Sequence, residues 1–168
     1  MSSTNTNKTE VNLILLDDDP IFLLGLREVL KGEKFKDINV IATGKIADFS
    51  VLLTQDQNNL WVVSLDFYKY PSQSNNFLKS LEKLNIKYPD LSLVILLPWG
   101  FVGDFSLIPA IKGYCYKNSE IDELVKIFRA CALGETCFYL NNSVVKSQNI
   151  YTWFNTQIKL GLKQIQEE

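Results

Sequence analysis

Three consecutive carboxylates follow an apolar run near the start of the chain. Residues 13–16 are Leu-Ile-Leu-Leu, and Asp17, Asp18 and Asp19 come directly after them. Adjacent anions repel one another, which favours a bound cation or partial protonation. Carboxylate oxygens are ligands that Mg²⁺ prefers, so a magnesium site is one interpretation. The other is that the acids stabilise the start of a helix at Pro20, because proline and acidic residues both suit a first helical turn.

Two more charged residues stand at the ends of apolar runs. Residues 60–65 lead into Asp66, and residues 113–116 lead into Lys117. If these runs are parallel strands of one sheet, their carboxyl ends meet at the edge where open α/β sheets bind ligands. A carboxylate is a nucleophile for phosphoryl transfer, and a lysine together with a metal ion neutralises the transferred charge. Taken singly, Asp66 could be a turn residue and Lys117 a solvated or ion-paired lysine.

Strands and helices alternate along the chain in a pattern that would bring these residues together. Buried apolar runs alternate with segments of helical periodicity, which predicts a parallel sheet with helices on both faces. We therefore expect a doubly wound α/β fold built on five parallel strands. The strands are expected at 13–16, 38–42, 60–65, 91–97 and 113–117, and the helices at 20–30, 46–55, 77–88, 101–112 (loosely helical) and 121–133.

Four short segments resemble the response-regulator receiver domain, and in particular the receivers that precede a C-terminal helix-turn-helix. They are Leu-Leu-Asp-Asp-Asp-Pro at 15–20, Val-Ser-Leu-Asp at 63–66, Lys-Gly-Tyr-Cys-Tyr-Lys at 112–117 and Ala-Cys-Ala-Leu-Gly-Glu at 130–135. They follow the family's order over about residues 11–140. The resemblance implies a flavodoxin-like sheet with the strand order 2-1-3-4-5.

The resemblance also implies a role for each matching position. Asp66 would accept a phosphoryl group, and Lys117 would contact it. The Mg²⁺ ligands would be Asp17, Asp18, Asp66 and the loop residue Tyr68, through its backbone carbonyl. Tyr114 would occupy the position of the aromatic switch, on the face formed by the family's fourth helix, fifth strand and fifth helix.

The sequence departs from the receiver pattern at two places. Receivers carry a Ser or Thr at the end of the fourth strand, where the hydroxyl contacts the phosphoryl group and couples to the aromatic switch. Here that place falls on Leu97 or Pro98, and neither side chain has a hydroxyl. The proline of the loop after the phosphoacceptor is Pro71, five residues after Asp66 instead of four. The acids and the lysine are therefore kept, while the relay from the phosphate to the output face is altered.

Three functions are consistent with these residues. The first is a receiver that a partner histidine kinase phosphorylates on Asp66 with Mg²⁺, and that regulates transcription or another output through its surface. The second is a pseudo-receiver that binds protein partners without phosphorylation. The third, a Mg²⁺-dependent phosphatase, is disfavoured because no second general acid or base is evident and the chain has no histidine. We therefore expect a signalling protein and not an enzyme.

The composition limits the other classes of function. The chain has 168 residues, of which 46% are hydrophobic, and this is enough for the core of one domain. Its net charge of −2 and the lack of a long basic run give no reason to expect direct nucleic-acid binding. No apolar run approaches the length of a membrane span. The three cysteines lack metal-type spacing and are expected to be reduced core thiols, so we expect a cytoplasmic protein.

The expected domain organisation has three parts. Residues 1–10 are polar and expected to be disordered, 11–135 form the receiver-like domain, and 136–168 hold a linker and an amphipathic C-terminal helix. That helix is expected over 150–165, where apolar residues recur on one face. It would pack on the domain, form a homodimer contact, or begin a C-terminal output region that this chain lacks.

Overall fold

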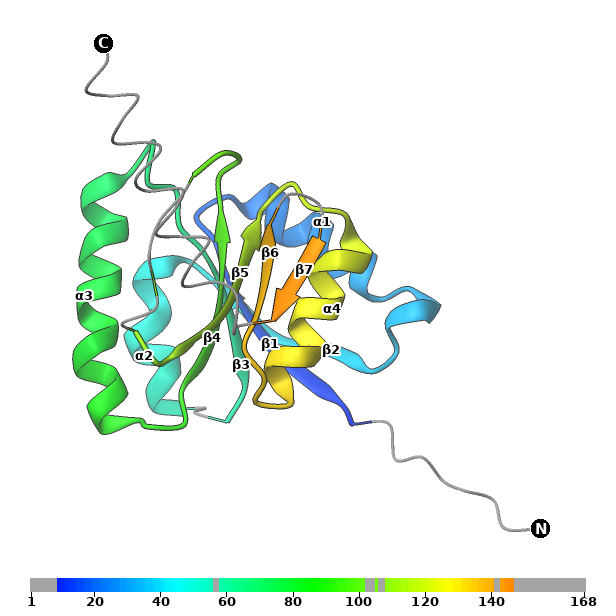
Figure 1. Ribbon diagram of the computed structural model, residues 1–168, viewed down its shortest axis with the longest axis horizontal. Helices are drawn as coiled ribbons and strands as arrows, with labels where there is room; N and C mark the ends of the chain where they lie inside the picture. Colours follow the sequence, from blue (N-terminus) through cyan, green and yellow to red (C-terminus); the bar gives the residue numbers. More distant parts are fainter. Residues whose placement is uncertain (1–8, 56–57, 102–104, 106–107, 141–142, 147–168) are drawn as a thin grey trace.

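A single β-sheet between two layers of helices forms the body of the protein (Figure 1). The computed structural model describes residues 9–55, 58–101, 105, 108–140 and 143–146. The strands are β1 (Val11–Leu16), β2 (Ile38–Gly44), β3 (Leu60–Ser64), β4 (Ser92–Leu97), β5 (Ile111–Tyr116), β6 (Cys137–Leu140) and β7 (Ser143–Lys146). The helices are α1 (Pro20–Leu30), α2 (Phe49–Gln55), α3 (Pro71–Lys87) and α4 (Ile121–Ala132), with short 3₁₀ turns η1 (Glu33–Phe35) and η2 (Ile46–Asp48).

The strand order confirms the predicted doubly wound sheet and extends it. The order is β2-β1-β3-β4-β5-β6-β7, and the first five of these strands pair in parallel in the expected order. β6 adds in parallel to β5, and β7 returns antiparallel to β6. These two strands lie in the segment that was expected to be a linker. The helix expected at 150–165 and the segment 1–8 lie outside the described residues.

Two expected helix boundaries were wrong. The third helix begins at Pro71 and not at residue 77, because proline fits the first helical turn and the polar residues after it continue the helix. The loosely helical segment expected at 101–112 is also incorrect at its end, since β5 already begins at Ile111. Gly100 has a φ of +78°, which favours a turn before this segment. Residues 102–104 and 106–107 lie outside the described residues.

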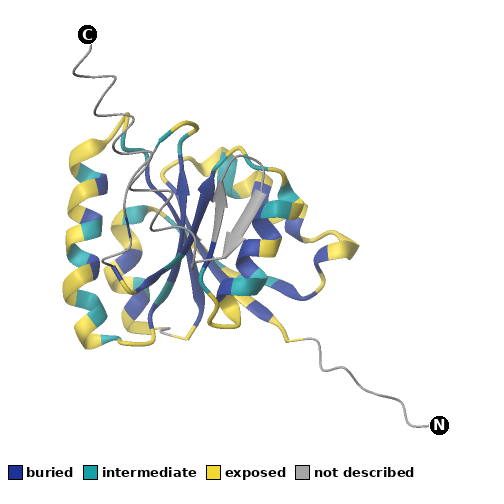
Figure 2. Cartoon of the chain, in the orientation of Figure 1, coloured by how far each residue is buried: buried dark blue, intermediate teal, exposed yellow. Residues whose placement is uncertain are grey.

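The apolar core is divided by the sheet into two halves. α2 and α3 cover one face and α1 and α4 cover the other (Figure 1). Because side chains alternate along a strand, Leu13 and Leu15 face α1 and α4, whereas Ile14 and Leu16 face α2 and α3. Figure 2 shows the buried residues concentrated in the strands and on the inner sides of the helices. Burying each large apolar side chain stabilises the fold by about 1.5–3 kcal/mol.

An ion pair between Arg129 and Asp37 joins α4 to the segment before β2. The Nε and Nη2 atoms of Arg129 donate to the two carboxylate oxygens of Asp37, each over 2.8 Å. Nη2 also donates to the Lys34 carbonyl over 3.2 Å. The Asp37 side chain is 5% exposed, and the guanidinium contacts both of its carboxylate oxygens. The hydrogen bond to Asp37 raises the pKa of Arg129.

Arg129→Met is expected to lower the free energy of unfolding by about 3 kcal/mol, because it removes a guanidinium that donates to both oxygens of a buried carboxylate. Urea unfolding at pH 7 measures the change. The control is Lys31→Met, which breaks the exposed Lys31–Glu28 pair and should cost less than about 0.5 kcal/mol. Equal effects of the two substitutions would contradict the role given to Arg129.

The three cysteines, Cys115, Cys131 and Cys137, are buried, as expected. Burial raises the pKa of Cys131 to about 12, and Cys137 adds to the rise. Burial also raises the pKa of Cys115. The Cys115 and Cys131 thiols therefore stay protonated at a pH where thiols of the unfolded chain ionise.

A thiol reagent at pH 8 is expected to leave the native protein unmodified and to react with three thiols once the protein unfolds. The folded pKa of Cys131 lies above the ordinary value of 9.0, so its contribution to stability is present below pH 9 and is lost as the pH rises towards 12. Rapid labelling of the native protein, at a rate independent of added denaturant, would disagree with this burial.

Candidate functional site

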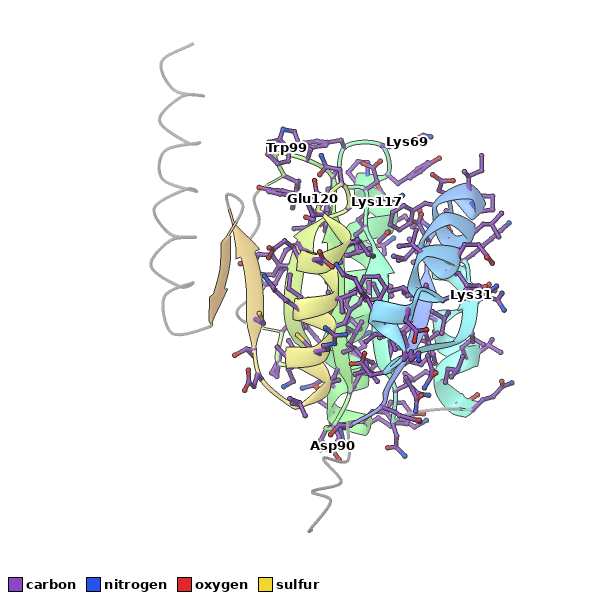
Figure 3. The ribbon with its side chains drawn as sticks, turned by 90° about the vertical axis from the view of Figure 1, so that its right-hand side faces the viewer. Lys31, Lys69, Asp90, Trp99, Lys117 and Glu120 are labelled. Carbon is purple, nitrogen blue, oxygen red and sulfur yellow. The ribbon has the colours of Figure 1, made fainter. Side chains whose placement is uncertain are left out.

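A cavity of about 350 Å³ opens at the carboxyl edge of the central strands. Its walls include the charged residues Asp17, Asp18, Asp66 and Lys117. Figure 3 shows Lys117 at the same end of the sheet as Lys69 and Trp99, with Asp90 at the opposite end. The structure therefore brings together the charged side chains that the strand ends were expected to supply.

Strand alternation explains why these side chains share one cavity. Asp17 follows Leu15 by two residues, and Lys117 follows Cys115 by two. Leu15 and Cys115 lie in the core half that faces α1 and α4. Because side chains two apart on a strand point the same way, the charged residues project on that face just beyond the apolar core.

Asp19 begins α1, which confirms its expected role as a helix start. Its Oδ1 accepts hydrogen bonds from the amides of Ile21 (3.0 Å) and Phe22 (3.3 Å). Pro20 occupies the first turn, where its missing N–H is not needed. Asp19 therefore serves the helix, while the two acids before it face other partners.

Lys117 is paired with Asp17. Its Nζ lies 2.7 Å from Asp17 Oδ2 and 3.9 Å from Asp19 Oδ2, close enough for ion pairs. It also lies 4.3 Å from the centroid of the Phe22 ring, within the range of a cation–π contact. The Asp17 side chain is 7% exposed and that of Lys117 is 32% exposed, so solvent screens the pair only in part.

Asp18 is bound by the chain's own donors. Its Oδ1 accepts from the Ile46 amide (3.2 Å), and its Oδ2 accepts from the Gln73 side-chain amide (3.1 Å). Gln73 lies near the start of α3 and was missed in the sequence, because that helix was expected to begin later. A correct reading of Pro71 as a helix start would have placed Gln73 at this edge of the sheet.

Asp66 follows β3 and holds the loop after it. Its Oδ1 accepts from the amides of Tyr68 (3.1 Å) and Lys69 (2.9 Å), and its carbonyl accepts from the Tyr70 amide (2.8 Å). Both carboxylate bonds go to Oδ1. Oδ2 is left without a hydrogen-bond partner among the described residues. The side chain is therefore held in one orientation with one oxygen available.

Two of the predicted metal ligands, Asp17 and Asp18, are bound by donors of the chain itself. Among residues of the described ranges, no group of three or more acidic, cysteine or histidine side chains is arranged to hold one. Lys117 stands against Asp17, and Gln73 and a backbone amide take both oxygens of Asp18. A cation would first have to displace these donors. The assignment of Mg²⁺ to Asp17, Asp18, Asp66 and Tyr68 therefore stays a prediction.

One of the two candidates for the altered switch position lies in the core, and the other borders the cavity. Leu97 is 2% exposed and packs in the core half that faces α2 and α3. Pro98 lines the cavity. Pro98 is therefore the residue whose side chain borders the candidate site, and it offers no hydrogen-bond donor.

Aromatic rings connect the loop after Asp66 with β5. Phe67 stacks on Phe101 with ring centroids 4.4 Å apart, and Phe105 meets the Tyr114 ring edge-on at 5.5 Å. Phe67 and Phe105 are 6.2 Å apart, which completes the path. Tyr114, the predicted aromatic switch, is 3% exposed and packs in the α2 and α3 half of the core. Its switching role remains a prediction.

Comparisons with known proteins place the fold. No protein-family model and no curated protein matches the sequence. Among solved structures, the isolated receiver domain of RcsB from Salmonella enterica serovar Typhimurium, with the phosphomimetic BeF₃⁻, matches with a TM-score of 0.56 and 21% identity. That match covers 80% of this chain and 96% of the RcsB chain. This chain has the receiver fold.

Other receivers give the same result. The signal receiver domain of NarL from Mycobacterium tuberculosis matches with a TM-score of 0.53 and 18% identity, over 75% of this chain and 98% of that one. ChrA, the response regulator of a heme-sensing two-component system, matches with a TM-score of 0.55 and 24% identity over 79% of this chain. The match covers 61% of the ChrA chain, so this chain corresponds to only part of that response regulator.

Lys117→Met is expected to lower the free energy of unfolding by about 1–3 kcal/mol, because it leaves the buried Asp17 carboxylate unpaired. Adding Asp17→Asn should recover part of the loss, which a double-mutant cycle measured by urea unfolding would show. The control is Lys126→Met, whose exposed pair with Glu123 should contribute less than about 0.5 kcal/mol. The pairing would be refuted if Lys117→Met had no larger effect than this control.

Proposed function

We propose that the chain is a signalling receiver module that accepts a phosphoryl group on Asp66 from a phosphohistidine of a partner kinase. The strongest support for this proposal is the environment of the Asp66 carboxylate. The Oδ2 atom of Asp66 has no partner among the described residues, and Asp66 lines the same cavity as Lys117. The receiver fold is consistent with this role.

The chemistry needs a fixed nucleophile and a nearby positive charge. Asp66 Oδ2 would form the new bond to phosphorus while the bond between phosphorus and the histidine nitrogen breaks. The imidazole, protonated on its other ring nitrogen, then leaves as the neutral base. The amides of Tyr68 and Lys69 hold Oδ1 and orient the carboxylate for this attack. The acyl phosphate would carry about −1.5 to −2 charge in place of the single negative charge of the carboxylate, and this gain would draw Lys117 away from Asp17.

That movement would carry the signal. The Lys117 amide donates to the Leu97 carbonyl over 2.8 Å, so the lysine backbone is tied to the end of β4. A change in the side-chain pairing of Lys117 would therefore act on the loops after β4 and β5. A protein partner, an output region beyond this chain or a second copy would read the change. RcsB forms dimers bound to DNA, and we propose that this chain could likewise form a homodimer in response to the change.

The location of the protein and its pathway are also proposed. We propose a cytoplasmic protein of a two-component pathway, whose output is transcription. The described residues include no helix long and apolar enough to span a bilayer. The chain would act by binding and signalling, without enzymatic turnover.

A second candidate function rests on a different observation. The acids beside Asp66 are already bound by Lys117, Gln73 and the Ile46 amide, as in a site that needs no cation. Pro98 also gives no hydroxyl to the cavity. These features favour a phosphorylation-independent module that binds protein partners through the receiver fold.

Incubation with acetyl phosphate or phosphoramidate, with and without Mg²⁺, is expected to add one phosphoryl group that intact-mass spectrometry detects. Asp66→Asn should abolish the mass gain, because it removes the nucleophilic oxygen. The control is Asp90→Asn, an exposed acid at the opposite end of the sheet, which should label like the native chain (Figure 3). A native chain that takes no label under either condition would favour the second candidate.

A further inference from the structure

A buried serine hydroxyl without a partner stands in the wall of the cavity. Ser64 is the last residue of β3 and is 7% exposed. Its Oγ has no hydrogen-bond partner among the described residues, although it is shielded from solvent. Buried polar atoms in folded proteins are nearly always hydrogen-bonded. An orphaned hydroxyl that borders a cavity therefore indicates a bond completed by something other than the chain.

The position of Ser64 on its strand directs the hydroxyl towards the nucleophile's side of the sheet. Val62 packs on the α1 and α4 half of the core, and Leu65 packs on the other half. Residues two apart share a face, so Ser64 lies on the face of Val62. Ser64 and Asp66 both line the cavity. Leu65, between them, also borders the cavity and packs in the other half of the core.

The Ser64 hydroxyl lies one strand away from the end of β4, where receivers carry a Ser or Thr hydroxyl that this chain lacks. In the β3–β4 pairing its partner is Leu96, two residues before Pro98. Pro98 borders the same cavity but has neither a side-chain donor nor an N–H. Compared with the receiver pattern, the cavity therefore lacks a hydroxyl at the end of β4 but has one at the end of β3.

We propose that Ser64 is a positioning residue whose hydroxyl donates a hydrogen bond to the phosphoryl group on Asp66. The inference rests on the proposed function of Asp66. Ser64 forms no covalent bond and loses no proton; Asp66 Oδ2 makes the bond to phosphorus. Donors aimed at the oxygens of a transferring phosphoryl group stabilise the charge that develops there. Lys117 supplies charge, and Ser64 fixes the direction of one oxygen.

The test compares Ser64→Ala with the native chain for the initial rate of labelling by acetyl phosphate. The ³¹P resonance of the phosphorylated protein is measured alongside. Removing an unpartnered buried hydroxyl should leave the melting temperature unchanged or higher, so the variant is expected to fold. The control is Ser80→Ala, whose hydroxyl donates to the Phe77 carbonyl within α3. Asp66→Asn defines the background rate.

We expect Ser64→Ala to label about tenfold more slowly and to shift the ³¹P resonance, while Ser80→Ala matches the native chain. A Ser64→Ala rate and resonance equal to those of the native chain would overturn the role of Ser64 and leave that of Asp66 standing. A native chain without any label that depends on Asp66 would overturn both, and this result is distinguishable because no variant then differs from background.

Discussion

The ion pair between Lys117 and Asp17 is the interaction on which the candidate site depends. These residues follow β5 and β1, which are separated in the sheet by β3 and β4. The contact therefore spans the carboxyl edge and closes one side of the cavity. It also neutralises an aspartate that lies at the boundary of the apolar core, where an unpaired charge would be costly.

The same pairing limits what the site can do. Lys117 forms an ion pair with Asp17, and Gln73 donates a hydrogen bond to Asp18, so both acids already have partners within the protein. Asp66 differs, because its two amide donors use one carboxylate oxygen and leave the other towards the cavity. Any added negative charge at Asp66 would compete with Asp17 for the lysine. A receiver that works in this way would move an internal cation in response to phosphorylation.

Much of this arrangement could be predicted from the sequence, because it depends on strand ends. Apolar runs that stop at Asp17, Asp66 and Lys117 determine both the sheet and the edge where the charges meet. The start of α3 was missed because its first turns are polar, and Gln73 was missed with it. β6 and β7 were not expected because their pairing depends on β5, which no local pattern reveals. Ser64 gave no signal of its own, since the environment of a hydroxyl depends on side chains from distant strands.

The most direct test of this account is an experimental structure of the chain treated with beryllofluoride, an analogue of the phosphoryl group. The account predicts the group on Asp66 Oδ2, with Ser64 Oγ and Lys117 Nζ in contact with it and Lys117 moved away from Asp17. An unmodified Asp66 beside an intact pair of Lys117 and Asp17, at a concentration of the analogue that modifies other receivers, would contradict it.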